Sequence, residues 1–122
     1  MSLYDPNNLF ARIIRGEIPS NKVYEDDYAL AFHDIYPKAP VHVLVCPKGP
    51  YISMTDFTAQ ASDAEIIGFN RAIAKVIEIL GVDVGGYRTI TNTGPNSGQE
   101  VPHLHVHILA GRVLGPMLVQ RD

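Results

Sequence analysis

Three histidines, His103, His105 and His107, stand at every second position and are separated by Leu104 and Val106. Alternating polar and branched apolar residues predict a β-strand, in which successive side chains point to opposite faces. We therefore expect the apolar residues to pack inward and the three imidazoles to line one surface. Histidine can act near neutral pH as a nucleophile, a proton donor or a hydrogen-bond partner of phosphate. The pattern predicts a functional site, because an imidazole buried without a partner costs free energy.

A metal site is the main alternative for these side chains, because histidine is a common zinc ligand. At roughly 3.3 Å per strand residue, His103 and His107 start about 13 Å apart, too far to share one ion. Two neighbouring histidines would need a third ligand from elsewhere, such as His42. No pair of cysteines or glutamates stands at metal-binding spacing in the sequence. We therefore expect neither a metal nor another cofactor.

The loop at residues 93–99, directly before the histidines, favours a phosphate ligand. Gly94, Ser97 and Gly98 are small enough for the backbone to approach a ligand and present N–H groups to an anion. Asn92 and Gln99 add neutral hydrogen-bond donors. A glycine-rich and asparagine-rich hairpin turn without a ligand is the alternative for the loop alone.

A second group of residues could hold a nucleoside. Asp34 ends a predicted strand, where its carboxylate could accept two hydrogen bonds from a ribose diol or simply form a turn. Phe10, Ile13, Ile18 and Phe32 could wall an apolar slot for a base. Each of these four could equally belong to an ordinary core.

The elements that must position these residues are predicted from periodicity and end signals. Strands are expected at residues 22–25, 28–34, 41–46 and about 87–92, in addition to the histidine strand. Ser62 and Glu65 have capping-box spacing and begin a helix that runs to about Leu80, with Gly81 as its stop. A short N-terminal helix is expected with Asp5 as its N-cap, Pro6 as its first residue and Gly16 as its stop. The fold class is α+β, with five antiparallel strands, one long helix and one short N-terminal helix.

Length and composition limit the possibilities further. The 122 residues predict a single domain over residues 1–122, and the net charge of −3 gives no electrostatic footprint for nucleic acid or an anionic membrane. No apolar run approaches the roughly 20 residues that span a bilayer, and the N-terminal residues do not match a signal peptide. The single cysteine, Cys46, has apolar neighbours and is expected to be structural in a reducing compartment. We expect a cytoplasmic protein.

The chain resembles the histidine triad family, and specifically its nucleotide-binding Hint branch. The resemblance is carried by the histidine motif and by upstream segments that run from LFARIIRGEIP at 9–19 through YEDD at 24–27, AFHDI at 31–35 and APVH at 39–42 to GQEV at 98–101. The tail GRVLGPML at 111–118 is similar to bacterial members. The resemblance covers nearly the whole chain.

This resemblance implies a HIT-like fold, a homodimer and a hydrolase that acts at the α-phosphate of purine nucleotides carrying an amine. His105 would be the nucleophile that forms a nucleotidyl-histidine, and His107 a proton donor and phosphate contact. His103 and His42 would support them, and Asp34 would hold the ribose. The remaining contacts would be made to the phosphate by Asn92, Gly98, Gln99 and the backbone near Glu100, and to the base by Phe10, Ile13, Phe32 and His33.

Two side chains refine these expectations. A carboxylate beside the α-phosphate would repel it, so we expect the Glu100 side chain to point outward. Ile66 and Ile67 widen the apolar face of the long helix, which places that helix at the expected dimer interface.

Two other functions stay open at this point. A dinucleoside polyphosphate hydrolase of the same family tends to carry Pro-Arg after the histidines, where this chain has Ala110-Gly111-Arg112. A purine-nucleotide-binding regulatory module with little turnover would use the same pocket. The intact third histidine, His107, favours hydrolysis, because related nucleotidyl transferases have glutamine there.

Overall fold

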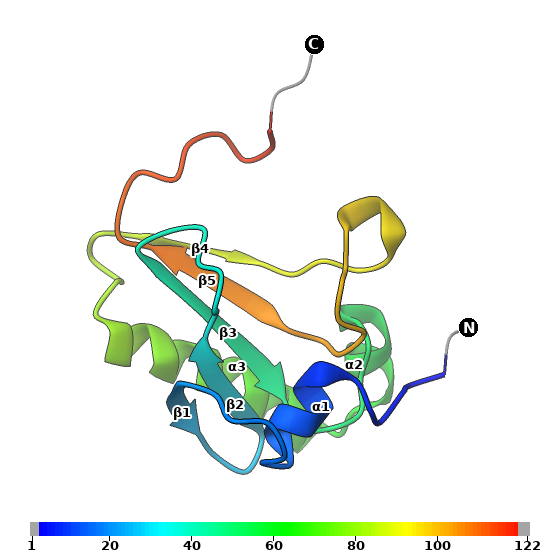
Figure 1. Ribbon diagram of the computed structural model, residues 1–122. Coiled ribbons are helices and arrows are strands. Elements are labelled where there is room, and N and C mark those ends of the chain that lie inside the picture. The colour runs from blue at the N-terminus through cyan, green and yellow to red at the C-terminus, as the bar shows by residue number, and fades with distance from the viewer. Residues whose placement is uncertain (1–2, 120–122) are drawn as a thin grey trace.

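The described part of the computed structural model, residues 3–119, is built on one antiparallel sheet (Figure 1). Its strands are β1 (Lys22–Glu25), β2 (Ala29–His33), β3 (Val41–Pro47), β4 (Tyr87–Ile90) and β5 (Val106–Ala110), in the spatial order β1-β2-β3-β5-β4. The helices are α1 (Leu9–Ile14), α2 (Met54–Gln60) and α3 (Asp63–Leu80), with a 3-10 helix, η1 (Pro95–Ser97). The α+β class predicted from the sequence is confirmed.

Helix α3 covers one face of the sheet and builds the larger core (Figure 1). Phe69, Val76 and Ile77 pack there against alternate residues of the strands, such as Val43 and Ile108. Ser62 and Glu65 form the predicted capping box, and Gly81 ends the helix in a left-handed conformation at φ 67°. These local signals were sufficient to predict this helix from sequence.

Helix α1 lies on the opposite face, where it covers only the part of the sheet around β2 and β3. Phe10 packs there against Phe32, Leu44 and Cys46. The predicted N-cap, Asp5, is wrong: Asn8 caps the helix by accepting a hydrogen bond from the Ala11 N–H at 2.9 Å. Asp5 instead accepts from the Asn7 N–H and shapes the turn before the helix.

A second short helix, α2, was missed by the sequence prediction. Ser53 and Asp56 form a capping box at its start, and Phe57 anchors it in the larger core. The spacing of Ser53 and Asp56 is the signal that could have found it. Among the described residues, no helix is long and apolar enough to cross a membrane.

The histidine strand is shorter than predicted. Strand β5 begins only at Val106, because the preceding backbone bonds to a loop: the Leu104 N–H donates to the Tyr51 carbonyl at 2.7 Å. The alternation nevertheless holds, and Leu104, Val106 and Ile108 all point into the core beneath α3. Their histidine neighbours therefore belong to the side of the sheet that carries α1.

Candidate active site

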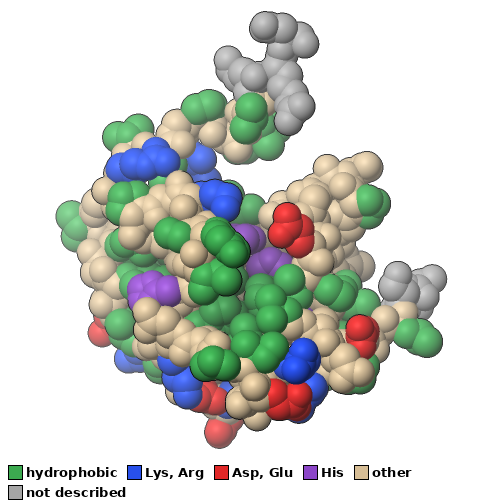
Figure 2. All heavy atoms as spheres, in the orientation of Figure 1, with side chains coloured by type: hydrophobic (Ala, Val, Ile, Leu, Met, Phe, Trp, Pro, Cys, Tyr) green, Lys and Arg blue, Asp and Glu red, His purple; other side chains and the backbone are tan. Residues whose placement is uncertain are grey.

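The part of the sheet that α1 leaves uncovered is hollowed into a pocket of about 360 Å³, which we call the histidine pocket. Figure 2 shows histidine side chains at its bottom, beside apolar atoms and an acidic group at the rim. Its lining brings together predicted site residues from five separate segments of the chain: Phe10, Asp34, His42, Asn92, Gly98, Gln99, Glu100, His105 and His107.

Three histidines line this pocket: His42 in β3, His107 in β5, and His105 directly before β5. His42 stands on β3 and His107 on the adjacent β5, where His107 pairs with Leu44. The His42 and His107 rings are 5.2 Å apart between centroids, and those of His105 and His107 are 5.0 Å apart. Phe10 closes the other side with its ring 4.8 Å from His105.

The expectation that all three histidines of the motif line one open surface is wrong for His103. Its side chain is fully buried, and it is not among the residues that line the pocket. Its Nε2 lies 2.7 Å from the Pro47 carbonyl, and its Nδ1 lies 2.6 Å from the Tyr4 hydroxyl. His103 therefore lies buried outside the pocket lining, and the supporting role expected for it stays a prediction.

Burial keeps these imidazoles neutral at pH 7. It lowers the pKa of His103 to about 4, and it lowers the pKa of His107 to about 4 together with the neighbouring His105 and His42. Burial also lowers the pKa of His42 and of His105. A neutral imidazole carries one proton, so the partners of its two nitrogens decide which nitrogen holds that proton.

The partners of His42 and His107 settle where their protons lie. The backbone N–H of Lys38 can only donate, and it donates to Nδ1 of His42 at 3.0 Å. The proton of neutral His42 is therefore on Nε2, which donates to Nδ1 of His107 at 2.9 Å. His107 must then hold its own proton on Nε2, the nitrogen left available to the pocket. This ring is a hydrogen-bond donor toward a ligand.

His105 is in the opposite tautomer, with its proton on Nδ1. Its Nδ1 lies 2.7 Å from the carbonyl oxygen of His103, which can only accept. Nδ1 is therefore protonated, and Nε2 carries a free electron pair. The pocket thus contains one imidazole with a lone pair and, beside it, one with an N–H group. This is the arrangement that attack on an electrophile next to a hydrogen-bond donor requires.

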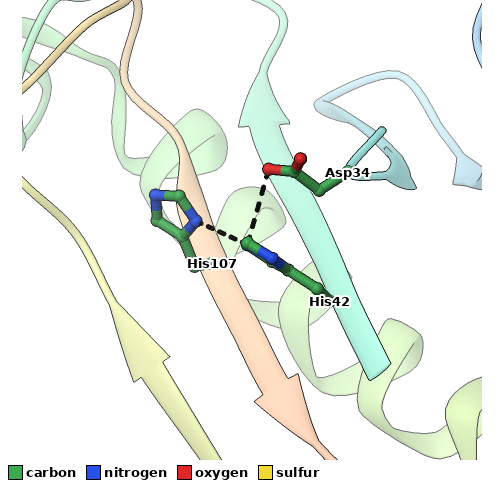
Figure 3. A group of neighbouring side chains, drawn as sticks. All are labelled: Asp34, His42 and His107. Atoms are coloured by element: carbon green, nitrogen blue, oxygen red, sulfur yellow. Dashed lines mark hydrogen bonds and ion pairs between the residues drawn. The ribbon is translucent and has the colours of Figure 1, made fainter. Parts of the chain in front are cut away.

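The same cluster raises the question of a metal, because donor atoms of Asp34, His42 and His107 lie within 4.8 Å of one another (Figure 3). In Figure 3 the side chains converge from the segment after β2 and from β3 and β5, with His42 Nε2 3.5 Å from Asp34 Oδ2. A metal would need a lone pair on His42 Nε2. The Lys38 N–H occupies the other nitrogen, so Nε2 holds the proton. The cluster as hydrogen-bonded does not fit a metal.

A second cavity of about 310 Å³ adjoins the histidine pocket and shares Phe10, Asp34 and Glu100 with it. We call it the apolar slot. The predicted base-binding residues Ile13, Phe32 and His33 line it, with His33 exposed at the end of β2. Asp34 stands where the two cavities meet, which is the place a ribose between a base and a phosphate would occupy.

The loop after β4 is organised by one of the predicted phosphate ligands. The Gln99 amide donates to the carbonyls of Ile52 and Val101 and accepts from the Gly94 N–H. Its side chain therefore shapes the loop and has no amide hydrogen left over for a ligand. Gly98 needs its positive φ of 79° to end η1, and Asn92 lines the pocket.

Glu100 stands at the rim of the pocket, and the outward direction expected for its side chain stays a prediction. It is solvent-exposed, and it borders both the histidine pocket and the apolar slot. With Asp34 it gives the rim two carboxylates, against the single lysine, Lys38, that lines the same pocket.

Three functional groups were missed by the sequence analysis. They are the Lys38 backbone N–H, the Tyr4 hydroxyl and the exposed Tyr36, which lines both cavities. Pro37 and Pro40 on either side of Lys38 indicated a restrained connection, but they did not indicate what it contacts.

Comparisons with known proteins identify the family of this chain. The model of the HIT domain family matches residues 15–114. A HIT-like protein from Azospirillum brasilense is 57% identical over 117 residues, with 96% of each chain covered. The purine nucleoside phosphoramidase of Escherichia coli strain K12 is 45% identical over 116 residues, covering 93% of this chain and 94% of that one.

Solved structures show the same relationship. A histidine triad protein from Clostridium difficile superposes with a TM-score of 0.82 at 44% identity, covering 95% of this chain and all of that one. A HIT family hydrolase from Clostridium thermocellum gives a TM-score of 0.79 at 40% identity, covering 93% and 97% of the two chains. With the family model matched over most of its length, this chain belongs to the histidine triad (HIT) family.

Proposed function

We propose that this protein is a purine nucleoside phosphoramidase that cleaves at the α-phosphate through a nucleotidyl-histidine. The observation that carries the proposal is that the two neighbouring imidazoles of the pocket are in opposite tautomers, one with an acceptor and one with a donor toward a ligand. His105 offers a lone pair on Nε2, and His107 offers an N–H beside it. The phosphoramidase of Escherichia coli, to which the chain is 45% identical, supports the choice of reaction.

In the first step, His105 Nε2 attacks the α-phosphorus, and the bond from phosphorus to the amine nitrogen breaks. The nitrogen keeps the electron pair and takes a proton from a water molecule, and the hydroxide that remains accepts a hydrogen bond from His107 Nε2–H. The positive charge that develops on His105 is stabilised by the His103 carbonyl at Nδ1. In the second step, that hydroxide attacks phosphorus, and the bond to Nε2 breaks with its electron pair returning to nitrogen. The nucleoside monophosphate leaves, and His105 is again neutral with its proton on Nδ1.

The two cavities support a nucleotide as the substrate. The apolar slot is walled by Phe10 and Phe32, whose rings meet edge to face at 5.5 Å, and it has room for a base. Asp34 would accept from the ribose hydroxyls at the junction, and the α-phosphate would lie over His105 and His107. The backbone N–H of Glu100 would complete the phosphate contacts, because those of Gly98 and Gln99 donate to the carbonyls of Pro95 and Gly94.

The negative charge at the rim of the pocket favours an amine as the leaving group. Asp34 and Glu100 border the pocket, and a polyphosphate chain would bring further negative charge toward them. A neutral or cationic amine does not meet this repulsion. Repulsion at the rim therefore favours phosphoramidates over dinucleoside polyphosphates as substrates.

The experiment is turnover of a panel by the purified chain: nucleoside phosphoramidates, acyl nucleotides and dinucleoside polyphosphates. We expect release of the monophosphate from the phosphoramidates, and an enzyme mass increased by one nucleotidyl group after an alkaline quench. Faster turnover of the polyphosphates would move the assignment to that hydrolase. Tight nucleotide binding without turnover of any member would identify a binding module.

We also propose that the protein is a homodimer joined along β4 and α3. Strand β4 is an edge of the sheet, and unpaired edges are commonly covered by another chain. Beside it runs a groove with two hollows of about 320 and 370 Å³, both of which are lined by Asn70, Ile73, Ile77 and Tyr87. A second copy related by a two-fold axis would cover the edge and the groove together.

The isoleucines expected at this interface have different roles. Ile66 packs against the core beneath α3, whereas Ile67 is 53% exposed. Ile67 lies three and seven residues before Asn70 and Ala74, so it shares their side of the helix, which faces the groove. Ile67 is therefore the better probe of the dimer. The cytoplasmic location expected from the sequence stays a prediction.

A further inference from the structure

The segment before α1 places a tyrosine against the histidine that the pocket does not use. The Tyr4 hydroxyl lies 2.6 Å from Nδ1 of His103, and the two rings meet edge to face with centroids 5.6 Å apart. His103 follows Tyr4 by 99 positions in the chain and is fully buried. This contact joins the N-terminal segment directly to the first histidine of the motif.

The direction of the hydrogen bond follows from the other partner of His103. Its Nε2 lies 2.7 Å from the Pro47 carbonyl, which can only accept, so Nε2 holds the proton of this neutral ring. Nδ1 is then an acceptor, and the Tyr4 hydroxyl must donate to it. Burial raises the pKa of Tyr4, so the phenol keeps this proton at neutral pH.

His103 in turn holds the nucleophile through its backbone. The carbonyl of His103 accepts from Nδ1 of His105 at 2.7 Å, and this contact leaves the electron pair of His105 on Nε2. A ring that is fixed at both nitrogens, by Tyr4 and by Pro47, cannot rotate. The position of the carbonyl then depends on both contacts, because the ring and the carbonyl belong to one residue.

We propose that Tyr4 is a positioning residue for the hydrolytic reaction: by donating to His103 Nδ1, it fixes the carbonyl that keeps His105 in its reactive tautomer. The inference rests on the proposed function for its kinetic consequence. The effect on the tautomer of His105 can be observed without any substrate.

The test is Tyr4→Phe, which removes one hydroxyl and keeps the ring that contacts His103. We expect kcat for an adenosine phosphoramidate to fall on the order of tenfold while KM stays within about twofold, since positioning affects attack rather than binding. The matched control is Tyr24→Phe. It removes a hydroxyl that donates to Asp26 at 2.9 Å, outside both cavities, and should leave kcat unchanged.

The decisive readout is the ¹⁵N spectrum of the histidine rings in the free protein. In the wild type, His105 should show one neutral form with the proton on Nδ1, whereas Tyr4→Phe should show a mixture of both tautomers. An unchanged His105 spectrum overturns the proposal, whatever happens to kcat, because the hydroxyl would then serve stability alone. A changed spectrum with kcat within twofold of wild type also overturns it.

Two further arms keep the test interpretable. If Tyr4→Phe does not fold, 3-fluorotyrosine at position 4 keeps the donor and makes it more acidic. The ¹⁵N shift of His103 Nδ1 should then move while activity stays within about twofold, and an unmoved shift refutes donation by Tyr4. If the wild type turns over no phosphoramidate, the proposed function fails, but the spectrum of His105 still decides the role of Tyr4.

Discussion

Lowering the pH from about 7 to about 4.5 should destabilise the fold, and His103 should be one of the two largest identifiable causes, together with His107. The His103 side chain is fully buried, and both of its nitrogens are bonded in the neutral form. Protonating it would place a positive charge in the core and convert the Nδ1 acceptor into a second donor that faces the Tyr4 hydroxyl.

The magnitude follows from the two pKa values of this histidine. In the unfolded chain it titrates near 6.5, whereas burial in the fold lowers the pKa of His103 to about 4. Between these values the unfolded state binds more protons, so the free energy of unfolding falls as the pH falls from 6.5 to about 4. The full effect is ~3 kcal/mol, with ~2 kcal/mol lost by pH 4.5. For a domain of this size, that is a large part of the total stability.

The measurement is urea unfolding of wild type and of His103→Gln at several pH values between about 7 and 4.5. Glutamine can still donate to the Pro47 carbonyl but does not titrate. Its stability should therefore fall ~2 kcal/mol less than that of wild type over this interval. Glu25 is little involved, because its pKa is lowered from 4.5 to about 2 and its contribution is lost mainly at lower pH. Equal losses in the two proteins would refute the reasoning.

Three further outcomes are expected. His105→Ala should lower turnover by several orders of magnitude and leave nucleotide affinity and the melting temperature nearly unchanged; turnover within tenfold of wild type would contradict the mechanism. Exhaustive treatment with EDTA should leave activity intact, and loss that added zinc restores would reverse our view of the Asp34 cluster. Ile67→Glu should weaken the dimer in sedimentation equilibrium, whereas Ile79→Glu, equally exposed but on the side of α3 opposite Asn70, should not. A wild-type monomer of 13.4 kDa at micromolar concentration would refute the dimer itself.

Much of the fold could be predicted because its signals are local. The capping box at Ser62, the apolar stripe of α3 and the alternation of Leu104, Val106 and Ile108 each depend on residues a few positions apart. The helix at 54–60 carried the same kind of signal at Ser53 and was overlooked. Asp5 and Asn8 both suit an N-cap, and the choice between them depended on where the chain turns onto the sheet.

The protonation of the histidines could not be predicted, because it depends on contacts between residues far apart in the sequence. His42 and His107 are 65 positions apart, and Tyr4 and His103 are 99 apart. The sequence indicated which side chains carry the chemistry, but not which nitrogen of each ring holds a proton. Nor did it indicate that the Gln99 amide donates both of its hydrogens to the carbonyls of Ile52 and Val101.

The protonation pattern of the site is specified mainly by the main chain. The Lys38 N–H and the carbonyls of Pro47 and His103 are peptide groups, and every amino acid except proline would supply the same donor at position 38. Side chains there can diverge between relatives without altering which imidazole attacks. Lys38→Pro, in contrast, would erase the donor. If only the histidines were grafted onto another scaffold, the imidazoles would be transferred without the backbone groups that fix which ring nitrogen holds the proton.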